Sequence, residues 1–158
     1  MTAVLILAAI VAIDQLTKYI AVTRLMPVGS VTFIKGIMDF TFVRNFGAAF
    51  GILQGAKGFF VLITLALAIG TVIAFKKMPK AKGYGLVRVS LLLILGGAIG
   101  NCIDRLFRGY VVDFFDTVFM EWPVFNMADI FVVIGAVLMA FAVLFVIKDE
   151  PKKVKGEK

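Results

Sequence analysis

The chain contains no histidine and only one cysteine, Cys102, among its 158 residues. The absence of histidine excludes the Ser-His-Asp and Cys-His nucleophilic systems, and it excludes metal sites that rely on imidazole ligands. A lone cysteine excludes an intrachain disulfide and a zinc site of several thiolates. Any hydrolytic chemistry must therefore use carboxylates, lysine or hydroxyl groups.

Charged residues are also scarce, at 17% of the chain, whereas 61% of the residues are hydrophobic. Ordinary soluble domains carry about 25% charged residues. Four apolar stretches come close to the roughly 20 helical residues that cross a bilayer: residues 3–22, 59–75, 86–103 and 128–147. We therefore predict an all-α membrane protein with four transmembrane helices, organised as one polytopic domain over residues 1–158.

The net charge of +7 comes largely from two short segments that flank apolar runs. Residues 76–88 contain five basic residues and no acid, and the tail, residues 148–158, is again rich in lysine. Short basic segments beside membrane helices are usually cytoplasmic. We expect both termini inside, the loops at residues 23–58 and 104–127 outside, and no binding of nucleic acid.

The first of the two outer loops has the pattern of a short β-hairpin. Residues 31–34 and the alternating run 39–44 flank Lys35 and Gly36, which form a turn signal. We expect this small extracytoplasmic β-hairpin or β-sheet element to lie at the membrane surface.

Asp14 and Lys18 are ionisable residues inside the first apolar stretch. A charge within a helical span costs on the order of 2.5 to 3.5 kcal/mol on insertion scales, so Asp14 requires a partner or a task. Lys18 lies one helical turn away, which allows an i,i+4 ion pair that packs the first helix. Direct contact with a substrate is the other interpretation, and the sequence does not decide between the two.

The third apolar stretch ends in small and polar residues. Gly96 and Gly100 have the spacing that lets two membrane helices approach closely. Asn101, Asp104 and Arg105 follow at offsets of three and four residues, so they share a helix face. We expect these three side chains to form a charge-assisted network at the outer end of the helix.

Residues 45–51 combine small residues with two phenylalanines. One interpretation is a tight turn with aromatic side chains anchored in the membrane surface. The other is that Asn45 hydrogen-bonds a peptide backbone in a partly dry site.

Two further acids belong to the second outer loop and the start of the fourth helix. Asp113 has apolar neighbours on both sides, and burial there would raise its carboxyl pKa. Asp129 opens the fourth helix, where the macrodipole favours a carboxylate. The predicted topology puts Asp14 and Asp104 at the same membrane face, so the four acids can converge. Two adjacent carboxyl groups that share a proton can activate water and polarise a carbonyl, as in aspartic proteases.

Five sequence blocks, in this order and across four spans, resemble those of the lipoprotein signal peptidase family, also called signal peptidase II. The blocks are residues 14–18 (DQLTK), 45–51 (NFGAAFG), 96–105 (GGAIGNCIDR), 111–114 (VVDF) and 125–129 (FNMAD). The resemblance implies an aspartic endopeptidase of the bacterial cytoplasmic (inner) membrane. Such an enzyme removes the signal peptide from diacylglyceryl-modified prolipoproteins just before the lipidated cysteine, without a metal or cofactor.

The resemblance also implies roles for individual residues. Asp113 and Asp129 would be the catalytic dyad, near the extracytoplasmic face, with the substrate's lipid chains in the membrane lipid and globomycin as the expected inhibitor. Asp104 is an alternative to Asp113, but an adjacent Arg105 favours an ionised, structural Asp104. The residues expected to bind substrate or support the site are Asp14, Lys18, Asn45, Gly47, Asn101, Asp104, Arg105, Asn126 and Ala128.

A proton- or ion-coupled transporter is a different interpretation of the intramembrane acids. A relay should run from one face to the other, yet the cytoplasmic halves of the four predicted helices contain no acid. A purely structural membrane subunit would leave the outer carboxylates without a purpose.

Overall fold

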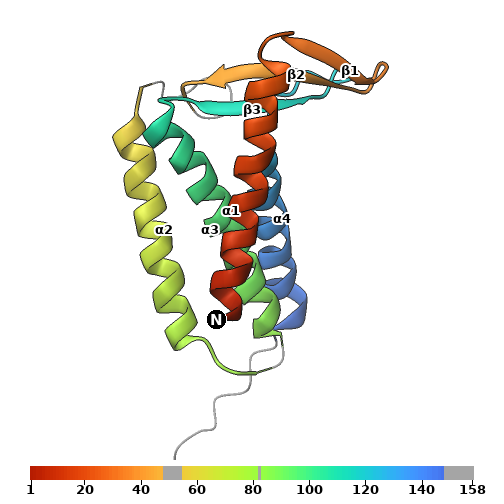
Figure 1. The fold of residues 1–158 in the computed structure, drawn as a ribbon. Coiled ribbons are helices and arrows are strands. Elements are labelled where there is room, and N and C mark those ends of the chain that lie inside the picture. Colours follow the sequence, from red (N-terminus) through yellow and green to blue (C-terminus); the bar gives the residue numbers. More distant parts are fainter. Residues whose placement is uncertain (48–54, 82, 148–158) are drawn as a thin grey trace, which may run out of the picture.

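The computed structural model describes residues 1–47, 55–81 and 83–147, and Figure 1 shows a helical bundle with a small sheet at one end. The segment 48–51 of the second sequence block, Lys82 and the lysine-rich tail lie outside the described residues. Two helices continue into a π-helical turn at their carboxyl end. The helical elements are α1 (Thr2–Ile20), η1 (Ala21–Leu25), α2 (Lys57–Lys77), α3 (Tyr84–Phe107), α4 (Met127–Phe141) and η3 (Ala142–Val146).

Four helical segments are long and apolar enough to cross a membrane, which confirms the four predicted spans. Many of their large apolar side chains, such as Leu62 and Leu144, remain exposed, as expected of surfaces that face lipid. The observed bounds differ from the predicted ones by a few residues at most ends. The spans are Thr2–Leu25, Lys57–Lys77, Tyr84–Phe107 and Met127–Val146.

Helix α3 is the centre of the bundle, because it packs against α1, α2 and α4. Its glycines make the close approaches possible. A Cβ atom at Gly96 would collide with Ile10 of α1, one at Gly100 would collide with Asp14, and one at Gly97 would meet the backbone of α4. The predicted close packing at Gly96 and Gly100 is therefore confirmed.

The sheet contains three antiparallel strands in the order β1 (Ser30–Ile34), β2 (Met38–Asn45) and β3 (Val111–Asp116). Strands β1 and β2 form the predicted hairpin, with Gly36 at a φ of 75° in the turn. Strand β3 was not predicted: it follows α3 and pairs with β2, so that Val43 lies opposite Asp113. The sheet thus brings together the two loops that were predicted to lie outside the membrane.

A small apolar core fixes the sheet to the end of the first helix. Ala21 and Leu25 of η1 pack against Val112 and Phe114 of β3, and all four side chains are buried. This packing holds one face of β3, that of Val112 and Phe114, against η1. The opposite face of β3 then points toward the candidate site.

Candidate active site

Asp113 projects from the face of β3 opposite to Val112 and Phe114, because successive side chains of a strand alternate. Its side chain is only 2% exposed. Each carboxyl oxygen accepts one amide hydrogen bond: Asn45 Nδ2 donates to Oδ2 at 2.9 Å, and Asn126 Nδ2 donates to Oδ1 at 2.6 Å. Asp113 is therefore held by side chains from two other segments of the chain.

Burial raises the pKa of the Asp113 carboxyl from 3.8 to about 7. The negative charge of Asp129 acts in the same direction, whereas the hydrogen bonds from Asn45 and Asn126 favour the ionised form. Loss of hydration outweighs these bonds. At neutral pH the carboxyl is therefore close to its midpoint and can hold or release a proton.

Asp129 lies in the first turn of α4, where it completes a capping box with Asn126. Asn126 N donates to Asp129 Oδ2 at 3.1 Å, and Asp129 N donates to Asn126 Oδ1 at 3.0 Å. Asn101 Nδ2 donates to the other oxygen of Asp129 at 2.8 Å. These donors and the positive end of the helix dipole stabilise a carboxylate at this position.

Two amides link the carboxyl groups of Asp113 and Asp129. Asn126 Nδ2, which donates to Asp113, also donates to Asn101 Oδ1 at 3.1 Å, and Asn101 in turn donates to Asp129. The two acids therefore belong to one hydrogen-bonded chain that connects β3, α3 and α4. The electrostatic effect of Asp129 on Asp113 follows from this proximity.

Lys18 is fully buried and makes three polar contacts. Its Nζ atom lies 3.0 Å from Asp14 Oδ2, 3.1 Å from Asp104 Oδ2 and 2.8 Å from Asn101 Oδ1. The i,i+4 ion pair between Asp14 and Lys18, one of the two interpretations of the sequence, is therefore present, and both side chains have no exposed surface. By bonding Asn101 Oδ1, Lys18 fixes that amide so that its NH₂ group points at Asp129.

Asp14 connects α1 to the start of α4, since its Oδ1 accepts a hydrogen bond from Ala128 N at 2.9 Å. Gln15 Nε2 donates to Asp14 Oδ2 and to the carbonyl of Gly100, both at 3.1 Å. Gln15 was not among the predicted site residues, although a polar side chain beside Asp14 in an apolar helix was a signal. Ala128 contributes its backbone N–H to the network.

The ion-pair partners of Asp104 are not the predicted ones, although its charge still acts on the guanidinium of Arg105. Asp104 pairs with Lys18 and with Arg108, and its Oδ2 accepts a hydrogen bond from Val112 N at 3.1 Å. Successive residues on a helix point in different directions, whereas residues four apart share a face, so Arg108 and not Arg105 reaches Asp104. Asp104 is fully buried, and its two cationic partners make it part of the structural network.

Arg105 instead connects α3 to the segment after β2 and to α2. Its Nη2 donates to the carbonyl of Gly47 at 2.6 Å, and its guanidinium lies 3.9 Å from the ring centroid of Phe60. Of the predicted network with Asn101, the structure has a bond from Arg105 Nη1 to the Asn101 carbonyl at 3.3 Å. The guanidinium charge also interacts electrostatically with Asp129 and Asp113.

Asn45 is positioned by a turn of its own segment. Gly47 N donates to Asn45 Oδ1 at 2.9 Å, which directs the Asn45 NH₂ group at Asp113. The structure thus brings all of the predicted site residues into one connected cluster. A carboxyl pair with one member near its protonation midpoint can act on a polar bond by general acid–base catalysis.

Comparisons with known proteins agree on one family. The model of the family described as signal peptidase (SPase) II matches residues 6–145. A lipoprotein signal peptidase of Caldanaerobacter subterraneus subsp. tengcongensis is 46% identical over 143 residues, which cover 90% of this chain and 96% of the relative. That of Listeria monocytogenes serotype 4a is 44% identical over 156 residues, covering 98% and 97%.

The fold is also similar to solved structures of bacterial membrane enzymes determined by the in meso method. One of them, at 2.3 Å resolution, superposes with a TM-score of 0.82 and is 39% identical, covering 96% of this chain and 94% of its own. A second, at 1.9 Å resolution, has a TM-score of 0.80 and is 40% identical, covering 92% and 94%.

Proposed function

Because this chain belongs to the signal peptidase II family, we propose that Asp113 and Asp129 together catalyse its reaction, the removal of the signal peptide from prolipoproteins. The observation that carries this assignment is the chain of hydrogen bonds from Asp113 through Asn126 and Asn101 to Asp129. It links the two carboxyl groups within one site, in which burial raises the pKa of Asp113 to about 7.

The two acids have different tasks in the proposed mechanism. Asp129, ionised at the amino end of α4, takes a proton from the attacking water. Asp113, protonated, donates a hydrogen bond to the carbonyl oxygen of the scissile peptide and stabilises the negative charge that develops there. The tetrahedral intermediate then collapses, and a carboxyl proton passes to the leaving amine, which breaks the peptide bond.

The buried network around Lys18 has a positioning task in this mechanism. Lys18 is held by Asp14 and Asp104, and it bonds the Asn101 oxygen. The Asn101 amide is therefore oriented before substrate arrives, and a preorganised donor needs no rearrangement during the reaction. None of these residues needs to contact substrate.

The sheet end of the bundle faces the extracytoplasmic side in this proposal. The connection between α2 and α3 lies at the opposite end, together with the amino terminus (Figure 1). Lys80 lies in that connection, and Lys76, Lys77 and Arg88 lie in the helical turns on either side of it. Basic segments of this kind tend to stay in the cytoplasm. The catalytic pair is then at the outer face of the cytoplasmic membrane.

We also propose that the substrate carries a diacylglyceryl-modified cysteine directly after the scissile bond. Its lipid chains would remain in the bilayer and set the position of cleavage, since an anchored substrate reacts as if at high local concentration. Globomycin, a cyclic peptide, would compete for the same site.

The test uses purified protein in detergent, a diacylglyceryl-modified prolipoprotein and the variants Asp113→Asn and Asp129→Asn. We expect both variants to fold and both to lose cleavage by at least about 10³-fold, because each removes a proton-transfer group. Asp116→Asn, on the same strand as Asp113, is the matched control and should cleave at the parental rate. Parental cleavage by either dyad variant would exclude that residue, and Asp104→Asn would then be tested.

A further inference from the structure

A second, apolar site lies between the end of the first helix and the sheet. It is a cavity of about 420 Å³, within the roughly 300–1,000 Å³ typical of small-molecule pockets. None of its lining residues belongs to the hydrogen-bonded cluster around Asp113 and Asp129, so the cavity is distinct from that cluster. The lining residues are Thr17, Ile20, Ala21, Arg24, Leu25, Val31, Phe40, Phe114 and Phe115.

The walls of this cavity do not suit water. Seven of the nine lining side chains are apolar. The hydroxyl of Thr17 already donates within its own helix, to the carbonyls of Ile13 at 3.0 Å and Asp14 at 2.8 Å. A buried water usually needs two to four polar partners, which these walls lack.

The position of the cavity along the first membrane span indicates which molecules surround its opening. The helical part of its lining, from Thr17 to Leu25, is the last part of the span Thr2–Leu25. A span of 24 residues is roughly 36 Å long and exceeds the ~30 Å hydrocarbon core, so its last turn reaches the headgroup level. The molecules that surround an apolar opening at this level are lipids.

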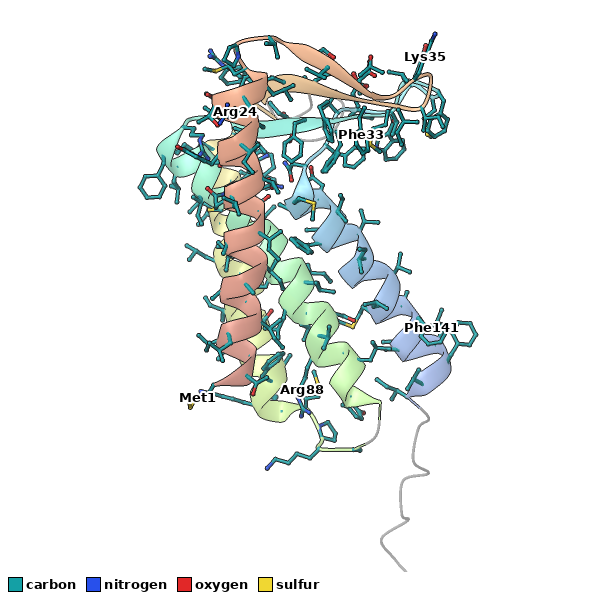
Figure 2. The ribbon with its side chains drawn as sticks, turned by 45° about the vertical axis from the view of Figure 1, so that its right-hand side comes forward. Met1, Arg24, Phe33, Lys35, Arg88 and Phe141 are labelled. Carbon is teal, nitrogen blue, oxygen red and sulfur yellow. The ribbon has the colours of Figure 1, made fainter. Side chains whose placement is uncertain are left out.

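Arg24 gives this cavity a preference for ligands that carry a negative charge. Arg24 belongs to η1, at the sheet end of the first helical segment (Figure 2); it lines the cavity and is exposed. Within the part of the chain that the structure describes, no hydrogen bond or ion pair engages its guanidinium. A guanidinium donates two parallel hydrogen bonds to a phosphate, which is the anionic group available at the headgroup level.

We propose that this cavity binds one acyl chain of an anionic phospholipid of the bilayer, whose phosphate pairs with Arg24. The chain would fill the space between η1 and the sheet and pack on Phe40, Phe114 and Phe115. Because Phe114 belongs to the strand that carries Asp113, the bound lipid would hold β3 against the first helix. The occupant is a membrane component and not the substrate.

The experiment measures phospholipid bound to the purified full-length chain by native mass spectrometry in detergent, with phosphatidylglycerol, phosphatidylcholine or diacylglycerol added. We expect phosphatidylglycerol to bind most tightly, with one molecule per chain. Arg24→Gln should raise its Kd about tenfold, as loss of one charge-assisted contact would. Lys35→Gln, at the far tip of the hairpin (Figure 2), removes the same charge and should leave the Kd unchanged.

A second pair of variants tests the acyl chain. Ile20→Trp introduces a ring at the cavity and should reduce binding, whereas Leu16→Trp alters the same helix outside the lining and should not. The proposal is overturned if Arg24→Gln and Lys35→Gln weaken binding equally, since the attraction would then be general. It is also overturned if Ile20→Trp binds like the parent, or if diacylglycerol binds as tightly as phosphatidylglycerol, which would make the substrate's own lipid the occupant. All readouts are of binding, so they are independent of the cleavage assay.

Discussion

The substitution Asp113→Asn should stabilise the protein above neutral pH while it abolishes cleavage. A carboxyl that is 2% exposed and has its pKa raised from 3.8 to about 7 is disfavoured in its ionised form by the fold. Between these pH values the folded state binds more protons at this residue than the unfolded state does. The free energy of unfolding of the parent therefore falls as the pH rises from about 4 to about 7, and it is constant above that range with respect to this group.

The size of the effect follows from the same pKa values. The difference between 3.8 and about 7 corresponds to about 4 kcal/mol at 1.36 kcal/mol for each pKa unit. An amide cannot accept hydrogen bonds at both ends, so one of the donors Asn45 and Asn126 is left poorly bonded, at a cost of about 1–3 kcal/mol. The protonated carboxyl of the parent also accepts a hydrogen bond less well at the oxygen that carries its proton. Part of this cost is therefore already present in the parent. We therefore expect a net gain of about 1–3 kcal/mol at pH 8 and almost none at pH 4.

Thermal unfolding in detergent, followed by circular dichroism at several pH values, measures this difference. One kcal/mol shifts the midpoint by about 2–4 °C in a domain of this size, so Asp113→Asn should unfold about 5 °C above the parent at pH 8. The control is Asp116→Asn, a half-buried acid of the same strand that accepts a hydrogen bond from Thr41. A midpoint for Asp113→Asn that lies below the parental one by the same amount at pH 4 and pH 8 would refute the reasoning.

Three further results are expected. Cleavage by the parent should decline as the pH rises through about 7, because Asp113 then loses the proton that polarises the carbonyl; a rate that keeps rising to pH 9 would contradict this role. Lys18→Met should lower stability by about 3–5 kcal/mol, since it leaves buried carboxylates unpaired; an unchanged thermal midpoint would argue against the network. Gly100→Val should destabilise by about 1–3 kcal/mol or more because its side chain would meet Asp14, whereas Gly70→Ala, where a Cβ meets nothing within 4 Å, should not.

The helices and the hairpin could be predicted from the sequence because both rest on local patterns. Length and hydropathy locate the spans, and alternation around Lys35 and Gly36 locates the first two strands. Strand β3 was missed because its sequence, VVDFFD, does not alternate between apolar and polar residues: four of its six residues are buried and the last two are half-buried. Its strand character depends on pairing with β2, which a local pattern does not reveal.

The membership of the candidate site was easier to predict than its connections. The acids were expected at one face because topology alone brings their loops together. Arg108 was missed because Arg105 lies next to Asp104 in the sequence, whereas helix geometry brings the residue four positions on into contact. The role of Asn101 between Lys18 and Asp129 depends on contacts among α1, α3 and α4, which follow from packing.

Asp129 has two roles, because its carboxylate caps the amino end of α4 and also belongs to the proposed reactive pair. An inhibitor that bound the proposed pair would therefore be difficult to escape by point mutation. If Asp129 acts as proposed, a change there would remove a reactive group and weaken the cap of α4 in the same step, so resistance would have to arise elsewhere, through altered drug entry or target abundance.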